Sequence, residues 1–400
     1  MKLHPGEALI FAEADIDGLH VASNEAIDQK YIKGDVRIVT EQARYPLNAI
    51  PSMVDSGDYE LNPEFQRRHR WDTTKKSRLI ESFIMNVPIP PVFLYEDRYS
   101  HYEVMDGLQR LTAISEFYTD KYSLEGLQEW SELNGRRYSE LPEQIRRGID
   151  RRYLSSIILL QETAKNETEA LRLKQLVFER INSGGIKLEP QESRNAIYNG
   201  PLNQLCISLA RNVYLCRMWG IPEPTPEEIQ YGTVPDALLE NESYRKMDDV
   251  ELVLRFFAYR QRLQHHKGAL RDYLDRFLKH GNLLPEDVLA FFQTLFEATV
   301  KLVYDTLGEQ AFWLWRKRVT GWSWYSRPTT VLYDPVMFAF SQNLEHADEL
   351  RARSDEIRAR LPRFYESNYD SFEGRYTNLS NIGDRNQLFV TFLADVLNRS

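Results

Sequence analysis

The segment Asp106–Arg110 reads Asp-Gly-Leu-Gln-Arg, so it places a carboxylate, an amide and a guanidinium around one glycine. The preceding residues, His101–Met105, alternate imperfectly between polar and apolar side chains, which indicates a strand. After the segment, Leu111, Ile114 and Phe117 recur at helical spacing. The pattern therefore predicts a strand, a tight turn and the first turn of a helix.

The start of a helix is a natural place for an anion. Its first amides have no backbone partner, and the helix dipole makes that end partly positive, so phosphate groups bind readily there. Gly107 would let a ligand approach the backbone closely, because it has no side chain. Arg110, in the first turn, can offer two parallel hydrogen bonds to phosphate oxygens. The segment thus has the residue types of a phosphate site.

Asp106 is open to two interpretations. It could cap the helix by accepting backbone amides, or it could hold a cation or a water molecule beside a bound phosphate. An Asp-Gly pair before an amphipathic helix is most often a cap alone. Taken by themselves, the five residues favour that simpler interpretation.

Four other motifs accompany this segment in a fixed order along the chain. Gln66–Trp71 reads Gln-Arg-Arg-His-Arg-Trp, and Pro88–Pro91 reads Pro-Ile-Pro-Pro. Phe178–Gly185 reads Phe-Glu-Arg-Ile-Asn-Ser-Gly-Gly, and Leu188–Ala196 reads Leu-Glu-Pro-Gln-Glu-Ser-Arg-Asn-Ala. Together with Asp106–Arg110, this ordered set resembles the GmrSD-type N-terminal domain family, a ParB/sulfiredoxin-like fold found in bacterial anti-phage and restriction proteins. The resemblance is close over roughly residues 40–200.

The resemblance implies nucleotide binding, often with hydrolysis, in proteins that sense or cut foreign DNA. Carried over by position, Gly107 and Arg110 would bind the nucleotide phosphates. Asp106, Gln109 and Arg110 would be the catalytic residues, and Asp106 would also be the ligand of a Mg²⁺ ion. The nucleotide would be GTP or ATP.

The same resemblance brings two distant segments to the phosphates. Gln66 and Arg67 would face the pocket, and Arg180 and Asn182 would close it from a later helix. Without the family pattern, Arg180 and Asn182 would be interpreted as structural, because a cation and an asparagine both suit a helix C-terminus.

The chain departs from the family motif, Asp-Gly-Gln-Gln-Arg, at Leu108. A side chain two residues past the aspartate could point into the core, and leucine would then be harmless. If the glutamine of the family positions water instead, hydrolysis is in doubt in this chain.

The net charge of −9 over 400 residues argues against a uniformly basic protein that coats DNA. A local cluster of cations is nevertheless present, at Arg67, Arg68, Arg70, Lys75, Lys76 and Arg78. It fits a solvated helix face and a DNA contact equally well. We keep Arg68, Arg70, Lys75 and Lys76 as candidate DNA contacts.

Cys206 and Cys216 are the two cysteines, and their surroundings lack metal-ligand spacing. This usage fits a reducing compartment. The first residues lack the apolar core of a signal peptide, and no apolar run reaches the length of a membrane helix. We therefore expect a soluble, cytoplasmic protein with no membrane partner.

The organisation of the chain changes near residue 200. Strand and helix patterns alternate before it, which predicts an α/β domain, and the periodicity after it is mostly helical. We expect an N-terminal arm or lid at residues 1–35. A ParB/sulfiredoxin-like nucleotide-binding domain is expected at 36–200, and a mostly α-helical C-terminal domain at 201–400.

Two further groups of residues carry expectations. Glu192, Arg194 and Asn195 are expected to form a hydrogen-bonded brace between helices. Four tryptophans gather with Tyr325, at positions Trp313, Trp315, Trp322 and Trp324. Such rings could stack on bases, but core packing at helix junctions is far commoner and is the expectation here.

The sequence contains no Walker loop and no His-Asn-His nuclease segment of the kind fused to many relatives. The favoured hypothesis is an NTP-binding, NTP-hydrolysing sensor or regulatory component of an anti-phage, restriction-like system, whose effector (a nuclease or an ATPase) is a partner chain. The alternative is a DNA-binding module or Mg²⁺-dependent nuclease that uses the same basic pocket for a DNA phosphate. A third hypothesis is a scaffold with a vestigial pocket.

Overall fold

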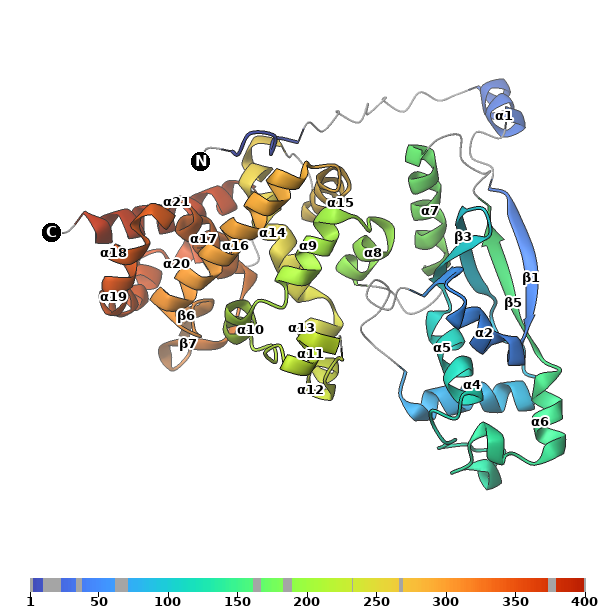
Figure 1. The fold of residues 1–400 in the computed structure, drawn as a ribbon. Coiled ribbons are helices and arrows are strands. Elements are labelled where there is room, and N and C mark those ends of the chain that lie inside the picture. Colours follow the sequence, from blue (N-terminus) through green and yellow to red (C-terminus); the bar gives the residue numbers. More distant parts are fainter. Residues whose placement is uncertain are drawn as a thin grey trace. The chain divides into compact units, whose positions relative to one another are not determined.

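The computed structural model describes residues 3–9, 23–33, 38–61, 71–160, 167–182, 189–231, 233–265, 269–372 and 379–398. The chain divides into two compact units (Figure 1). One, here called the sheet unit, is Asp15–Leu188, and the other, the helical unit, is Met1–Ala14 with Glu189–Ser400. The expected succession of an α/β region and a mostly helical region is confirmed.

The sheet unit contains a five-stranded mixed sheet in the order β1-β5-β3-β4-β2. Its strands are β1 (Thr40–Pro46), β2 (Tyr59–Glu60), β3 (Val92–Arg98), β4 (His101–Asp106) and β5 (Tyr153–Leu159). Its helices are α1 (Asn24–Lys33), α2 (Ile50–Asp55), α4 (Thr73–Ile84), α5 (Leu108–Tyr118), α6 (Glu143–Asp150) and α7 (Glu167–Asn182). Short 3₁₀ turns are η1 (Leu47–Ala49), η2 (Ser131–Leu133) and η3 (Tyr138–Glu140). β3 pairs with β5 in parallel and with β4 antiparallel, so β3 and β4 lie inside the sheet.

Alternation along the inner strands selects the core face. Leu94 of β3 pairs with Val104 of β4, and both are completely buried. They pack in one cluster with Ile50 of α2 and with Leu111 and Ile114 of α5. Each fully buried leucine or isoleucine stabilises the fold by about 1.5–3 kcal/mol. This cluster therefore fixes α5, and the turn before it, against β4.

Helix α4 begins where the sequence predicts. The Asp72 carboxylate accepts the amide of Lys75 at 2.7 Å, so the predicted N-cap is confirmed. Leu79 and Phe83 of this helix join the main core cluster. Ile80, on the neighbouring face, packs with Phe117 in a second cluster that continues into the loops after α5.

A buried carboxylate on α4 fastens the loop after α5. Glu81 is 5 % exposed, and its Oε1 accepts the amides of Gln128, Glu129 and Trp130 at 3.1, 2.9 and 3.0 Å. Three consecutive amides on one oxygen compensate its desolvation. The sequence of this loop is polar and irregular, so it does not predict the contact with Glu81.

Glu81→Ala should therefore destabilise the sheet unit by about 3 kcal/mol, because three backbone amides lose their shared acceptor together. Urea unfolding followed by circular dichroism measures the change. The control is Glu129→Ala, since that side chain is exposed and should change stability by less than about 0.5 kcal/mol. Equal effects of the two substitutions would contradict the anchoring role of Glu81.

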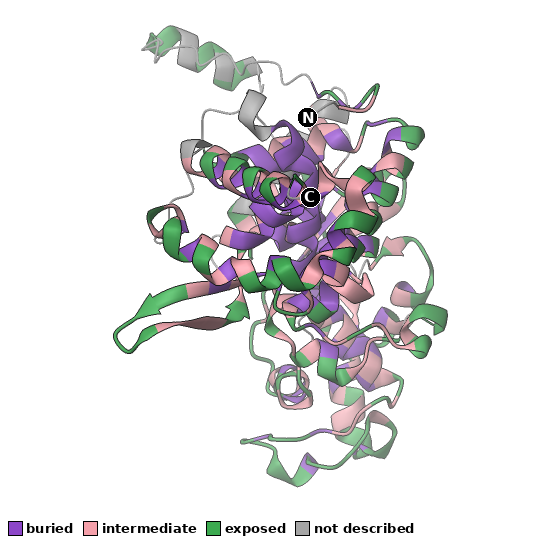
Figure 2. Cartoon of the chain, turned by 90° about the vertical axis from the view of Figure 1, so that its left-hand side faces the viewer, coloured by how far each residue is buried: buried purple, intermediate pink, exposed green. Residues whose placement is uncertain are grey.

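The helical unit contains most of the helices. In chain order they are α8 (Pro190–Ile197), α9 (Pro201–Leu209), α10 (Val213–Trp219), α11 (Pro226–Tyr231), α12 (Asp236–Glu240), α13 (Glu242–Arg245), α14 (Asp248–His265), α15 (Leu270–Gly281), α16 (Glu286–Leu307), α17 (Thr330–Ser341), η5 (Leu344–His346), α18 (Ala347–Ala352), α19 (Ser354–Ser367), α20 (Tyr369–Phe372) and α21 (Leu379–Leu397). Phe257 of α14 stacks on Phe292 of α16, with ring centroids 4.5 Å apart. Figure 2 shows the buried residues concentrated among these central helices.

Residues 3–9 belong to the helical unit. Glu7 is completely buried, and its carboxylate forms an ion pair with Arg260 of α14. The amide of Leu9 donates to Gln261 Oε1 at 3.0 Å. Residues 3–9 of the expected N-terminal arm are thus packed on α14, whereas α1 belongs to the sheet unit.

The expected brace around Arg194 is confirmed. Its Nε donates to Asp275 of α15 at 2.7 Å, and its Nη1 donates to Glu251 of α14 at 2.8 Å. Arg194 is almost fully buried, so both charge-assisted bonds compensate its desolvation. The brace holds α8 inside the helical unit, whereas the sequence analysis placed residues up to 200 with the α/β domain.

The four tryptophans lie on two strands and not at a helix junction, so that part of the expectation is wrong. β6 (Trp313–Arg318) and β7 (Gly321–Pro328) form an antiparallel hairpin, in which Trp315 pairs with Trp324. All four tryptophans are half-buried. The pattern was missed because aromatic side chains suit a pleated surface as well as a helix junction.

No described helix is long and apolar enough to cross a membrane. Cys206 and Cys216 are buried thiols without a disulfide bond.

Candidate functional site

The predicted strand, turn and helix around Asp106 are confirmed. β4 ends at Asp106, and α5 begins at Leu108. Gly107 lies between them with φ 100° and ψ 7°, a left-handed conformation that L side chains rarely adopt. The turn also brings the backbone against β3. A Cβ on Gly107 would overlap the Val92 side chain and lie 3.0 Å from Arg110 Nη2.

Arg110 is fixed by two acceptors. Its Nη2 donates to Asp106 Oδ2 at 2.7 Å and to the carbonyl oxygen of Pro91 at 3.2 Å. The Arg110 side chain is 15 % exposed and that of Asp106 is 37 % exposed. Arg110 Nε is buried and has no hydrogen-bond partner among the described residues. The guanidinium therefore retains donor capacity at a fixed position.

Asp106 does not cap α5, so the capping interpretation is wrong. Gly107 occupies the N-cap position, and in this part of the described chain no side chain caps the helix. The amides of Arg110 and Leu111 both donate to the Gly107 carbonyl. The carboxylate of Asp106 instead forms an ion pair one helical turn along, with Arg110. The first amides of α5 are left to other acceptors.

Gln109 connects the site to the segment before α4. Its Oε1 accepts the backbone amide of Trp71 at 3.1 Å. Trp71 is the first described residue after 62–70, the range that contains Gln66, Arg67, Arg68 and Arg70. Those four predicted site residues lie outside the described residues.

Leu108 points into the core. It is 6 % exposed and packs in the same cluster as Leu111 and Ile114. The expectation that the side chain two residues past the aspartate points into the core is thus confirmed. Leucine is compatible with this position, and Leu108 cannot orient water in the site.

Helix α7 is fastened to the sheet close to Asp106. Lys174 forms an ion pair with Glu103 of β4 at 2.5 Å, and its ammonium lies 5.5 Å from the ring centroid of Tyr95. Arg180 is exposed in the last turn of α7, six residues and about 9 Å of helix axis beyond Lys174. Asn182 ends the helix, and its side chain lies outside the described residues.

The described cations at the start of α4 differ in their surroundings. Lys76 forms an ion pair with Glu116 at 2.7 Å, so its charge is locally neutralised. Lys75 is exposed, with its ammonium 4.9 Å from the ring centroid of Trp71. Lys75 is therefore the better placed of the two for an anionic partner.

A metal ion would depend on its ligand for most of its coordination. The described residues contain no group of three or more His, Cys, Asp or Glu side chains that could hold a metal. Mg²⁺ is commonly bound through one or two carboxylates together with substrate phosphates and water. The lone, half-exposed carboxylate of Asp106 fits that arrangement and does not fit an all-protein metal site.

Two contributors to this site were not predicted from the sequence. The Pro91 carbonyl holds Arg110, although Pro88–Pro91 was noted only as part of the family pattern. The Lys174–Glu103 pair positions α7, and neither residue belongs to a motif. The available signal was Glu103, a glutamate in the middle of the strand that ends at Asp106.

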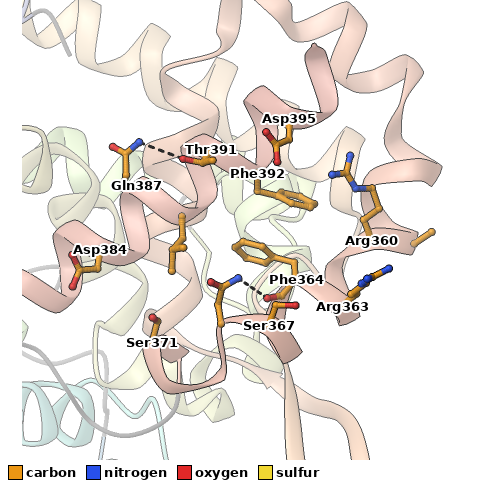
Figure 3. A pocket seen from close by; sticks show the side chains of 13 residues that line it. Arg360, Arg363, Phe364, Ser367, Ser371, Asp384, Gln387, Thr391, Phe392 and Asp395 are labelled. Carbon is orange, nitrogen blue, oxygen red and sulfur yellow. Dashed lines mark hydrogen bonds between the residues drawn. The ribbon is translucent and has the colours of Figure 1, made fainter. Parts of the chain in front are cut away.

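The helical unit contains a separate groove between α19 and α21, with a volume of about 920 Å³ (Figure 3). Its apolar floor includes Phe364 and Phe392, whose ring centroids are 4.7 Å apart. Arg363 lies on the wall formed by α19, and Asp384 and Asp395 lie on the wall formed by α21. The volume suits a small ligand, but the sequence analysis singled out none of these residues.

A strand that ends in Asp-Gly, a helix that starts with a fixed arginine and a mixed sheet together define an α/β domain with an anion-compatible helix start. Residues 50–199 match the family model described as GmrSD restriction endonuclease, N-terminal domain. This part of the chain is a domain of that family, as the motifs predict. The chain matches no curated protein and no solved structure.

Gly107→Ala should lower the free energy of unfolding by about 2–4 kcal/mol. The left-handed backbone and the overlap with Val92 both oppose a Cβ at this position. Chemical denaturation measures the loss. Gly135→Ala is the matched control, because Gly135 also has a positive φ (85°) but has nothing within 4 Å of its Cβ position. The control should lose about 1 kcal/mol, and equal losses would exclude the close approach to Val92 as a cause.

Proposed function

We propose that the sheet unit binds the phosphates of GTP or ATP, with Mg²⁺, at Asp106–Arg110. In this proposal the chain is a sensor or regulatory component of a restriction-like anti-phage system, with a ParB/sulfiredoxin-like domain as its nucleotide-binding part. The observation that carries the proposal is the fixed guanidinium of Arg110 beside the uncapped start of α5. The name of the matched family, a restriction endonuclease, supports the biological setting.

A nucleotide that binds at this site has to compete with the ion pair between Asp106 and Arg110. Arg110 Nη2 is held by Asp106, so an incoming phosphate competes with that carboxylate for the guanidinium. The phosphate and the carboxylate also repel each other. A divalent cation bound to the phosphates would relieve this repulsion, and Asp106 is the carboxylate placed to ligate it. Binding should therefore depend strongly on Mg²⁺.

Hydrolysis of the bound nucleotide would rest on positioning and charge stabilisation. Arg110 would stabilise charge on the transferred phosphoryl group, and Asp106 would orient the attacking water. Gln109 would position the backbone at Trp71, because its side-chain oxygen accepts the Trp71 amide. Leu108 contributes no polar group, so slow turnover is the expected outcome.

The remaining phosphate ligands of the proposal lie on two other segments. Gln66 and Arg67 precede Trp71, and Arg180 and Asn182 end α7. The attachment of Trp71 to Gln109 and of α7 to β4 supports their approach to the start of α5. A nuclease or ATPase centre would be supplied by a partner protein.

A DNA phosphate in the same pocket is the weaker alternative. Of the described candidate DNA contacts, Lys76 is already neutralised by Glu116, and Lys75 is the exposed one. A single pocket for one phosphate also gives little affinity for a long polyanion, because that affinity scales with the number of phosphates contacted.

Isothermal titration with GTP and with ATP, each with and without Mg²⁺, tests the proposal. Arg110→Ala should weaken binding by about 10- to 100-fold, because charge-assisted hydrogen bonds to phosphate are lost. Arg147→Ala is the matched control, since Arg147 is an exposed, ion-paired arginine on α6 of the same unit. An absence of binding heat with every nucleotide, or equal affinities of the two variants, would refute the proposal.

The role of Asp106 is tested by Asp106→Asn. This variant should bind nucleotide without Mg²⁺ more tightly than the wild type does, because the competing carboxylate is gone. It should also lose most of the gain in affinity that Mg²⁺ gives the wild type. The readout is the ratio of the two dissociation constants for each protein, and an unchanged ratio would remove Asp106 from the proposed site.

A further inference from the structure

The hairpin formed by β6 and β7 is a cationic segment of the helical unit. Between Trp313 and Pro328 the sequence has four cations, at Arg316, Lys317, Arg318 and Arg327, and no carboxylate. The whole chain has a net charge of −9. Figure 2 shows a two-stranded hairpin that extends from the helices and is exposed towards its turn.

One face of the hairpin is packed on helices of the same unit. Trp315 Nε1 donates to Glu366 of α19 at 2.8 Å. The ring of Trp324 lies edge-on to Tyr365, and the ring of Trp322 lies edge-on to Tyr369. These contacts hold the ribbon in a fixed orientation and occupy the tryptophan rings.

The opposite face carries cations around one aromatic ring. Because side chains alternate along a strand, Arg316 and Arg318 lie on the same face, away from Trp315. Their guanidinium carbons lie 6.0 and 5.9 Å from the ring centroid of Tyr325 on the other strand. Tyr325 thereby spaces the two arginines along the ribbon.

The outer half of the hairpin is exposed on both faces. Residues 316–321 are all exposed, and this range includes Lys317 on the tryptophan face. Among the described residues, no carboxylate forms an ion pair with Lys317 or Arg318. Two other exposed arginines of the helical unit do have such a partner: Arg217 pairs with Glu223, and Arg358 pairs with Asp355. In an acidic protein, two exposed cations of this kind at the end of a ribbon indicate a polyanionic partner.

We propose that the outer half of this hairpin binds duplex DNA, with Arg316, Lys317 and Arg318 on the phosphate backbone. A two-stranded ribbon fits the major groove of B-DNA, which is about 12 Å wide. Single strands are recognised chiefly through stacking on exposed rings, and here the tryptophan rings are packed on helices. The proposal does not rest on nucleotide binding at Asp106.

The geometry also argues against a membrane surface. Val319, at the turn, is the one large apolar side chain in the exposed outer half, so little apolar area could enter a bilayer. The arginines can instead form bidentate hydrogen bonds with phosphates that repeat along a groove. Duplex DNA is the partner that matches both the spacing of the two arginines and the positive charge of the hairpin.

Fluorescence anisotropy with a labelled duplex of about 20 base pairs, at several salt concentrations, tests the proposal on the full chain. The triple variant Arg316→Ala, Lys317→Ala, Arg318→Ala should bind more weakly than the wild type. The slope of log affinity against log salt should become shallower by about 2.7, which corresponds to three lost phosphate contacts. An unchanged slope would overturn the proposal.

The matched control removes three cations from helices of the same unit, as Arg271→Ala, Lys279→Ala and Lys301→Ala on α15 and α16. It should keep the wild-type slope, whereas an equal loss would mean that only net charge matters and would overturn the proposal. Arg316→Lys with Arg318→Lys keeps the charges and should keep most of the slope. Circular dichroism of each variant checks that the substitutions leave the fold intact.

Two further titrations identify the partner. Single-stranded DNA of the same length and polyglutamate should both bind more weakly than the duplex, and an equal or higher affinity for either would overturn the assignment to duplex DNA. The hairpin triple variant should keep the wild-type affinity for GTP and ATP, so failure of the hairpin proposal and failure of nucleotide binding are distinguished.

Discussion

The ion pair between Asp106 and Arg110 is the interaction on which the sheet unit's site depends. It joins the last residue of a strand to the first turn of the next helix, across a glycine that no other residue type could replace without strain. The carboxylate is drawn away from the helix amides, so the start of α5 keeps its unsatisfied donors. The pair therefore fixes a cation without occupying the first amides of α5.

The rest of the unit converges on this junction. The buried faces of β3 and β4 hold α5 in place, and the carbonyl of Pro91 orients the guanidinium from the other side. Gln109 accepts the amide of Trp71, just before α4, and Lys174 of α7 forms an ion pair with Glu103 of β4. Each contact joins a separate segment to the same strand–helix corner. Segments far apart in the chain thus contact this strand–helix corner.

Local patterns in the sequence were sufficient for much of this fold. The strand and helix around Asp106, the cap at Asp72 and the brace at Arg194 all rest on short-range chemistry. The pairing of Asp106 with Arg110 was missed because capping and ion pairing use the same carboxylate, and the choice depends on where Pro91 lies. The hairpin was missed because aromatic residues have two common environments. Its uninterrupted run of Arg-Lys-Arg was the signal against a buried position.

The position of α8 has a consequence for how the chain can be divided. The family match extends to residue 199, whereas the compact units separate between Leu188 and Glu189. α8 thus belongs to the matched region by sequence and to the helical unit by packing. A fragment that ends with the family match would separate Arg194 from both of its carboxylate partners. The end of the family match and the boundary between the compact units therefore differ by one helix, α8. Transfer of the matched domain to another protein would also have to transfer the helices that pair with Arg194.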